Sequence, residues 1–141
     1  MNRRRTAKEK GETGKLEKTS LEKLIREVIG CCIRVHMALG PGFLEAINHR
    51  ALEIELAESG IDFETENEIA LTYRGHHLGT HRLDLLVHGR LVVELKTVEE
   101  LTGQHYAQVR SYLKATGTSL GLLANFAERT LDPRRVELKA R

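Results

Sequence analysis

The chain has 141 residues and a formal net charge of +2; 40% of its residues are hydrophobic and 30% are charged. This length and composition are typical of one globular domain, and no apolar run approaches the roughly 18 residues that a membrane-spanning helix needs. Residues 1–19 lack the apolar centre of a secretory signal, so we expect a cytoplasmic protein that does not bind membranes.

Positive charge is concentrated at the N-terminus. Residues 1–19 contain seven Lys or Arg and three Glu, a balance of +4, whereas residues 20–141 have a balance of −2. A polar, basic segment cannot bury enough apolar surface to fold by itself, so we expect a disordered basic tail over residues 1–19. This tail is either a solvated extension or a weak, salt-sensitive contact for phosphate backbones.

Two helices are predicted after the tail. A capping box and apolar residues at helical spacing predict a first helix over residues 19–39, and the glycines and proline at residues 40–42 end it. A second helix is predicted over residues 43–59. The adjacent Cys31 and Cys32 do not fit disulfide geometry and have too few partners for a zinc site, so we expect both to be small apolar residues of the first helix.

Strands are predicted next. Apolar residues alternate with polar ones over residues 61–66 and again over residues 69–73, which predicts two half-buried strands. Residues 74–77 contain two histidines. Adjacent side chains in an extended segment diverge, so we interpret these four residues as a solvated turn and not as a metal site.

Residues 82–96, RLDLLVHGRLVVELK, are two apolar runs interrupted by charges. Alternation along the second run places Glu94 and Lys96 on one face of a strand, and Asp84 interrupts the first run. Isolated charges within a sheet are costly unless they are paired or bound to an ion. One hypothesis is a divalent metal site with two carboxylate ligands beside a lysine. The alternative is a solvated face on which Lys96 pairs with Glu94.

The metal hypothesis determines the length of the loop between these runs. A two-residue turn at residues 88–89 sends Asp84 and Glu94 to opposite faces of the sheet, and a one-residue slip reverses the faces. A three-residue loop over residues 87–89, with Gly89 in the left-handed conformation, places both carboxylates on one face. We therefore predict a three-residue loop.

The remaining elements predict the class of fold. Thr102 is the expected cap of a third helix that continues to about Thr116, and residues 120–126 are predicted to be a buried strand. Because this helix is a crossover connection, the strand is expected to lie parallel to residues 91–96. The chain is therefore predicted to be an α/β protein with a mixed sheet flanked by helices, followed by a basic C-terminal tail over residues 127–141.

The spacing of Asp84, nine intervening residues and Glu94-Leu95-Lys96 resembles the core motif of the PD-(D/E)XK nuclease superfamily. Residues 28–126 more closely resemble the small GxxExxY family within that superfamily. The tyrosine of that family's name falls on Asn48, and Leu83 stands where the superfamily name has proline. The matching segments are Val35-His36, Leu39-Gly40-Pro41-Gly42, Gly42-Phe43-Leu44-Glu45, Arg82-Leu83-Asp84, Val93-Glu94-Leu95-Lys96, and Gln108 with Tyr112.

The resemblance implies a restriction-endonuclease-like domain over residues 20–126. It implies a metal-dependent nuclease that hydrolyses phosphodiester bonds of nucleic acid, with DNA as the expected substrate. Asp84, Glu94 and the carbonyl group of Leu95 are then expected to hold Mg²⁺ or Mn²⁺. Lys96 is expected to position the attacking water or help to deprotonate it, and to offset charge in the transition state.

Two further residues each have two interpretations. Glu45 lies in the first turn of the second predicted helix, where the helix dipole stabilises a carboxylate; the resemblance implies instead a third acidic group at the metal site or a residue that holds a water there. Gln108 and Tyr112 are four residues apart on one helix face. Their spacing alone predicts a surface amide and a core aromatic, whereas the resemblance implies that Gln108 contacts the substrate or orients Lys96.

Two other classes of function remain open. The chain could be a catalytically inactive nuclease-fold module that binds nucleic acid or a protein partner, or a structural domain whose charges are coincidental. The presence of Asp84, Glu94 and Lys96 together favours the enzyme, because a binding module does not need the full set. A domain of this size would cut both strands of duplex DNA most easily as a homodimer, although no dimer seam is visible in the sequence.

Overall fold

The computed structural model describes the backbone of residues 7–138 and the side chains of residues 20–138. No helix in that part of the chain is long and apolar enough to cross a membrane. Its helices and strands are, in chain order, α1 (Ala7–Leu39), α2 (Glu45–Glu58), β1 (Phe63–Tyr73), β2 (His76–Val87), β3 (Leu91–Lys96), α3 (Gly103–Thr116), β4 (Leu120–Asn125) and β5 (Arg134–Glu137).

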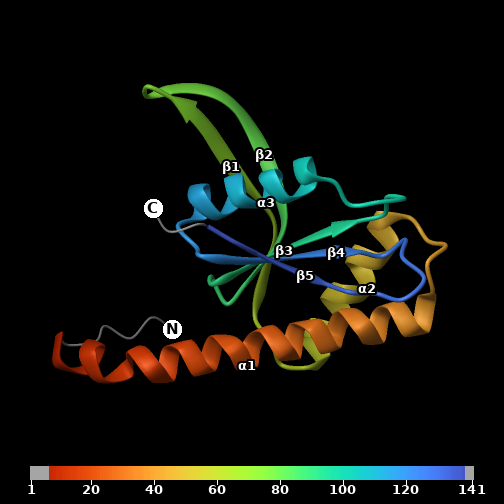
Figure 1. Cartoon of the computed structure of the whole chain (residues 1–141), viewed down its shortest axis with the longest axis horizontal. Helices are drawn as coiled ribbons and strands as arrows, with labels where there is room; N and C mark the ends of the chain where they lie inside the picture. Colours follow the sequence, from red (N-terminus) through yellow and green to blue (C-terminus); the bar gives the residue numbers. More distant parts are fainter. Residues whose placement is uncertain (1–6, 139–141) are drawn as a thin grey trace.

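The strands form one five-stranded sheet in the order β1-β2-β3-β4-β5. β3 and β4 are parallel, and every other neighbouring pair is antiparallel. Helices α1 and α2 lie on one side of the sheet and α3 lies on the other, where it connects β3 to β4 (Figure 1). The predicted α/β fold, with a mixed sheet flanked by helices and a parallel pair around a crossover helix, is confirmed.

Alternation along the central strands divides the apolar residues between two cores. Leu91, Val93 and Leu95 of β3 pack in the larger core with α1 and α2, whereas Val92 packs in the smaller core beneath α3. Because the sheet is covered on both faces, β3 and β4 read as nearly continuous apolar runs. Glu94 is the single acidic residue within this pair of strands, so its position is exceptional.

The start predicted for the first helix, Thr19, was wrong. α1 begins at Ala7, so most of the segment expected to be a disordered tail is helical, and residues 1–6 lie outside the described residues. Adding a residue to an existing helix is far easier than nucleating one, and Lys, Glu and Leu are strong helix formers. Cys31 and Cys32 are buried in α1 as free thiols, as predicted, and burial raises the pKa of Cys32 to about 12.

The two strands predicted over residues 61–66 and 69–73 are one long strand, β1. The predicted turn over residues 74–77 is shorter: Arg74 and Gly75 both have positive φ, and the strand β2 already begins at the exposed His76. β1 and β2 therefore form a long hairpin that projects beyond the body of the protein (Figure 1).

The C-terminal segment contributes a strand that we predicted to be part of a tail. β5 pairs with the outer edge of β4, and Val136 is buried while Arg134 and Arg135 are exposed. A four-residue edge strand needs only one apolar residue facing the core, and charged residues are common along such edges. This short pattern is too weak to identify from sequence. Arg135 also pairs with Glu22 of α1.

Candidate active site

The strands β2 and β3 are paired only next to their connecting loop. Val87 pairs with Leu91, and the ladder ends where Leu85 pairs with Val93. The loop has three residues, as predicted, but it is residues 88–90 and not 87–89; His88 and Gly89 both have positive φ. This register places the next residues along each strand, Asp84 and Glu94, opposite each other.

Side chains replace the backbone ladder at this point. The backbone N–H of Asp84 donates to Glu94 Oε1 at 2.8 Å, and the backbone N–H of Leu95 donates to Asp84 Oδ2 at 2.9 Å. Each carboxylate therefore bonds to the opposite strand across the gap that opens between β2 and β3. The two carboxylates lie on the same side of the sheet, as the three-residue loop requires.

A kink in the neighbouring strand accompanies this gap. β1 pairs with β2 at Thr65 and at Asn67, but the residue between them, Glu66, has a φ of 53° and lies level with Asp84. A positive φ is uncommon for a residue with a side chain. Beyond the kink, Leu83 packs in the core beneath α3, although Leu85 packs in the core of α1 and α2. The hairpin thus turns away from the sheet at Asp84.

Glu94 is buried beside a second negative charge. Its side chain is only 3% exposed. Burial and then the charge of Asp84 raise the pKa of Glu94 to about 8, against smaller opposing contributions from the Asp84 N–H and Lys96. The alternative interpretation, a solvated face on which Lys96 pairs with Glu94, is therefore wrong: Glu94 is not solvated, and within residues 20–138 Lys96 forms no ion pair with it.

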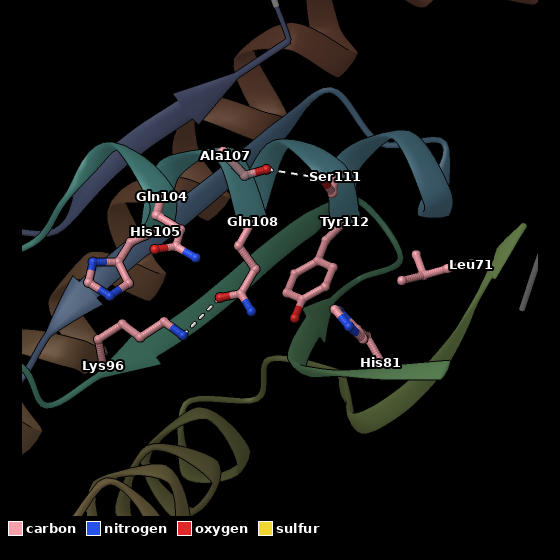
Figure 2. Close-up of a pocket in the computed structure, with 9 residues that line it drawn as sticks. All are labelled: Leu71, His81, Lys96, Gln104, His105, Ala107, Gln108, Ser111 and Tyr112. Carbon is pink, nitrogen blue, oxygen red and sulfur yellow. Dashed lines mark hydrogen bonds between the residues drawn. The ribbon is translucent and has the colours of Figure 1, made fainter. Parts of the chain in front are cut away.

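Lys96 is held by α3. Its Nζ donates to Oε1 of Gln108 at 2.8 Å, and Figure 2 shows Gln108 reaching from the helix toward the lysine on β3. Tyr112, one turn later, is 3% exposed and packs in the core beneath α3. Burial, followed by the charges of Glu94 and Asp84, raises the pKa of Tyr112 to about 12, so its hydroxyl group stays protonated at neutral pH.

Glu45 lies at the rim of the site. It is the first residue of α2, and although its side chain reaches solvent, partial desolvation and the charge of Asp84 raise its pKa, while Lys96 and His49 lower it. Among residues 20–138, no group of three or more His, Cys, Asp and Glu side chains could hold a metal ion. The structure thus brings Asp84 and Glu94 together, and Glu45 is near them without joining a compact triad.

Asn125 supports the end of β3, and the sequence did not identify this role. Its buried side chain accepts the N–H groups of Val98 and Ala127 at 3.1 and 3.2 Å and donates to the Val98 carbonyl at 2.8 Å. The N–H of Phe126 also donates to the carbonyl of Lys96 at 2.8 Å. These bonds fix the chain at Lys96 and directly after it. The only sequence signal was a polar residue at the end of a buried strand.

Asn48, at the position where the resemblance to the GxxExxY family predicts a tyrosine, contacts its own helix. Its Nδ2 donates to the carbonyl groups of Phe43 and Leu44, at 3.4 and 3.3 Å, across the start of α2. The side chain is 1% exposed, and its Oδ1 has no hydrogen-bond partner among the described residues. Asn48 is therefore a local helix contact next to Glu45.

The described donors fit a hard divalent cation in their chemistry. Asp84 and Glu94 provide adjacent carboxylate oxygens, which are the ligands that Mg²⁺ and Mn²⁺ prefer. Their mutual repulsion, seen in the raised pKa of Glu94, is what a nearby positive charge would relieve. Two carboxylates and substrate oxygens are an ordinary set for Mg²⁺, which keeps several waters.

The mixed sheet, its crossover helix and the paired carboxylates at the opening of β2 and β3 define an α/β domain of the restriction-endonuclease type. The chain matches the family model of the PD-(D/E)XK nuclease superfamily over residues 22–136 and therefore belongs to that superfamily. No curated protein matches the chain.

A similar fold is found in a solved structure described as "Crystal structure of SSO0001". The two chains are 22% identical, with a TM-score of 0.55. The similarity covers 68% of this chain but 50% of that one, so the present chain corresponds to about half of the other protein. This comparison supports the fold.

Proposed function

We propose that the chain is a metal-dependent nuclease that hydrolyses phosphodiester bonds of nucleic acid, with DNA as the expected substrate. The observation that carries this proposal is the pair of facing carboxylates, Asp84 and Glu94, one of them almost fully buried and neither paired with the nearby Lys96. A purely structural site would gain stability by pairing these charges or by replacing them with apolar residues.

Each residue of the site has its own role in the proposed hydrolysis. Asp84, Glu94 and the carbonyl group of Leu95 hold the cation, Mg²⁺ or Mn²⁺. When bound, this cation supplies Lewis-acid polarisation of the phosphate and a lower pKa for water. Lys96, whose Nζ donates to Gln108, positions the attacking water and stabilises negative charge in the transition state. Glu45 adds a carboxylate at the rim.

Gln108 restricts the long side chain of Lys96 to one direction. A lysine side chain has many rotamers, and a hydrogen bond from Nζ to a helix-mounted amide reduces their number before substrate binds. Gln108 therefore acts here as a positioning residue.

We also infer that the chain belongs to the GxxExxY group, on the basis of the matching segments and with Asn48 as a departure. We further infer a cytoplasmic location, and a homodimer for cleavage of both strands of a duplex.

Labelled single-stranded, duplex and branched DNA and RNA, incubated with Mg²⁺ or Mn²⁺, test the proposal. We expect metal-dependent cleavage by the wild type and a loss of at least about a hundredfold in Asp84→Asn and Lys96→Ala. Asp62→Asn and Lys114→Ala are matched controls, because both residues are exposed and lie outside the site. Chelation by EDTA should abolish cleavage by the wild type.

Metal binding is measured separately by titrating Mn²⁺ and following its electron paramagnetic resonance signal. The wild type and Lys96→Ala should bind Mn²⁺, whereas Asp84→Asn should bind it much more weakly. A wild type that cuts none of the substrates, or variants that cut as fast as the controls, would refute the catalytic proposal. The inactive binding module would then be the better description.

A further inference from the structure

An open pocket of about 540 Å³ lies beside Lys96, between α3 and the β1–β2 hairpin. Its wall on the helix side comes from residues one turn apart on α3, and its opposite wall comes from the hairpin (Figure 2). The lining residues are Leu71, His81, Lys96, Gln104, His105, Ala107, Gln108, Ser111 and Tyr112. We call this space the α3 pocket.

The lining of the α3 pocket differs in character from the carboxylate site next to it. None of the described residues that line it is acidic, and its one permanent cation, Lys96, already donates to Gln108. The other polar groups are two amides, two hydroxyl groups and two imidazoles: Gln104, Gln108, Ser111, Tyr112, His81 and His105. Gln104, Gln108 and Ser111 lie at intervals of four and three residues along one face of α3, and the Ser111 hydroxyl, which donates to the Ala107 carbonyl, can still accept. Phosphate groups are usually bound by clusters of Arg or Lys. This lining instead suits a flat, uncharged group with donors and acceptors on its edge.

An exposed ring lies at the far end of the pocket. His81 of β2 makes an edge contact with Tyr112, with ring centroids 6.0 Å apart and planes at 80°. Tyr112 is almost fully buried, whereas His81 is exposed, and a T-shaped contact leaves at least one face of the His81 ring uncovered by Tyr112. Histidine and other aromatic rings are the side chains on which unpaired bases stack.

The charge around the pocket is compatible with a nucleic acid strand. Residues 69–82, which form the outer part of the hairpin, contain two Arg and three His and no Asp or Glu, and Arg82 forms an ion pair with Glu68, the residue just before this range. Residues 20–141 as a whole have a slight excess of acidic residues, so the outer part of the hairpin differs from them in having an excess of basic residues. A strand whose phosphates follow the outer part of the hairpin would reach Lys96 past the mouth of the α3 pocket.

We propose that the α3 pocket receives one unpaired nucleobase of the substrate strand, stacked on His81 and contacted by Gln104 and Ser111. This inference rests on the proposed function for the position of the phosphate next to Lys96. A base within a duplex is paired and stacked and must be extruded before it can enter such a pocket. The preferred substrate is therefore a strand with an unpaired nucleotide beside the cut, as in single strands, flaps and frayed ends.

Binding measurements test the pocket independently of cleavage. The Asp84→Asn protein is titrated with a fluorescein-labelled thymidine 12-mer, with a 12-mer of the same length made of abasic nucleotides, and with a 12-base-pair duplex, and anisotropy is followed. We expect the thymidine strand to bind about tenfold more tightly than the abasic strand, which is the range of one base stacked on an aromatic ring. The duplex should bind more weakly than the thymidine strand.

Variants then test whether the preference for strands with bases depends on residues of the α3 pocket. His81→Ala and Gln104→Ala, each combined with Asp84→Asn, should reduce the preference for the thymidine strand over the abasic strand. The two substitutions together should bring the ratio of these two affinities close to one. His76→Ala is the matched control, because it is an exposed histidine of the same strand that does not line the pocket. His76, His81 and Gln104 are exposed whereas Asp84 is half-buried, so thermal melting of each variant checks that its fold is intact.

The outcomes separate this inference from the proposed function. Equal affinity for the thymidine and abasic strands, or a preference that survives both pocket substitutions, would overturn the base pocket even if the wild type cuts DNA. A preference that depends on His81 and Gln104 would support the pocket even if the wild type cuts nothing, and the catalytic proposal would then fail alone.

Discussion

Lys96 Nζ and Gln108 Oε1 are 2.8 Å apart, and this hydrogen bond connects the end of β3 to the middle of α3 across the face of the sheet. The lysine bonds to a neutral amide although two carboxylates lie on its own side of the sheet. Its charge therefore remains available to a phosphate, and its direction is fixed by a helix that is packed against the sheet.

Replacing Gln108 by Leu should slow catalysis without unfolding the protein. The leucine retains most of the side-chain volume but cannot accept from Lys96, so the lysine regains rotamers that point away from the site. We expect kcat to fall about tenfold, because the lost hydrogen bond involves a charged group. KM and the melting temperature should be nearly unchanged. Lys114→Ala, an exposed change on the same helix, is the control. A rise in KM with kcat unchanged would show that Gln108 binds substrate instead.

Glu94 should make the metal-free protein less stable as pH rises. The pKa of its carboxyl group is raised from 4.5 to about 8 in the folded protein, so between these values the folded chain holds a proton that the unfolded chain has released. The free energy of unfolding therefore falls from about pH 5 to about pH 8. Glu94→Gln should flatten this decline, as measured by urea denaturation across that range.

The control for the pH dependence is Glu100→Gln, which changes an exposed carboxylate. Mg²⁺ should stabilise the wild type near pH 8, because a cation bound there favours the charged form of Glu94, and it should stabilise Glu94→Gln much less. The same pH slope in Glu94→Gln and the wild type would contradict the assignment of a buried, repelled carboxylate.

Gly121 permits α3 to lie close to the sheet. A Cβ atom at this position of β4 would lie 2.8 Å from Val109 Cγ1 and 3.3 Å from the Val92 carbonyl oxygen. Gly121→Ala should therefore lower the free energy of unfolding by about 1–3 kcal/mol, as overpacked cores do. Val109→Ala in the same chain should recover part of this loss. Gly79→Ala, where no atom lies within 4 Å, should change stability by less than about 0.5 kcal/mol.

Asn125→Ala should destabilise the protein and weaken catalysis together. It removes three hydrogen bonds to Val98 and Ala127 and leaves buried backbone groups without their partners, a cost of at least about 2 kcal/mol. Asn125→Asp keeps the acceptor and loses the donor, so its stability in urea should lie between those of Asn125→Ala and the wild type. An alanine variant as stable as the wild type would show that the turn after β3 does not need these bonds.

Local patterns in the sequence determined the central part of this protein. Alternation predicted β3, the Thr102 cap predicted α3, and the crossover connection predicted that β4 would be parallel to β3. Each of these predictions depends on neighbours within a few residues or on a simple connection rule. The loop argument also predicted that Asp84 and Glu94 would share a face. Side chains alternate between the two faces of a strand, so an odd number of loop residues places both carboxylates on the same face and an even number places them on opposite faces.

Long-range contacts decided the rest. The two strands predicted over residues 61–66 and 69–73 are one strand, β1, which is kinked at Glu66 and turns away from the sheet there. No residue pattern within residues 61–73 predicts this kink. The strand β5 exists because the edge of β4 is available to a segment with one buried valine. The burial of Glu94, the choice of Gln108 as the partner of Lys96 and the pocket between α3 and His81 all depend on how separate elements pack, and packing is a property of the folded chain as a whole.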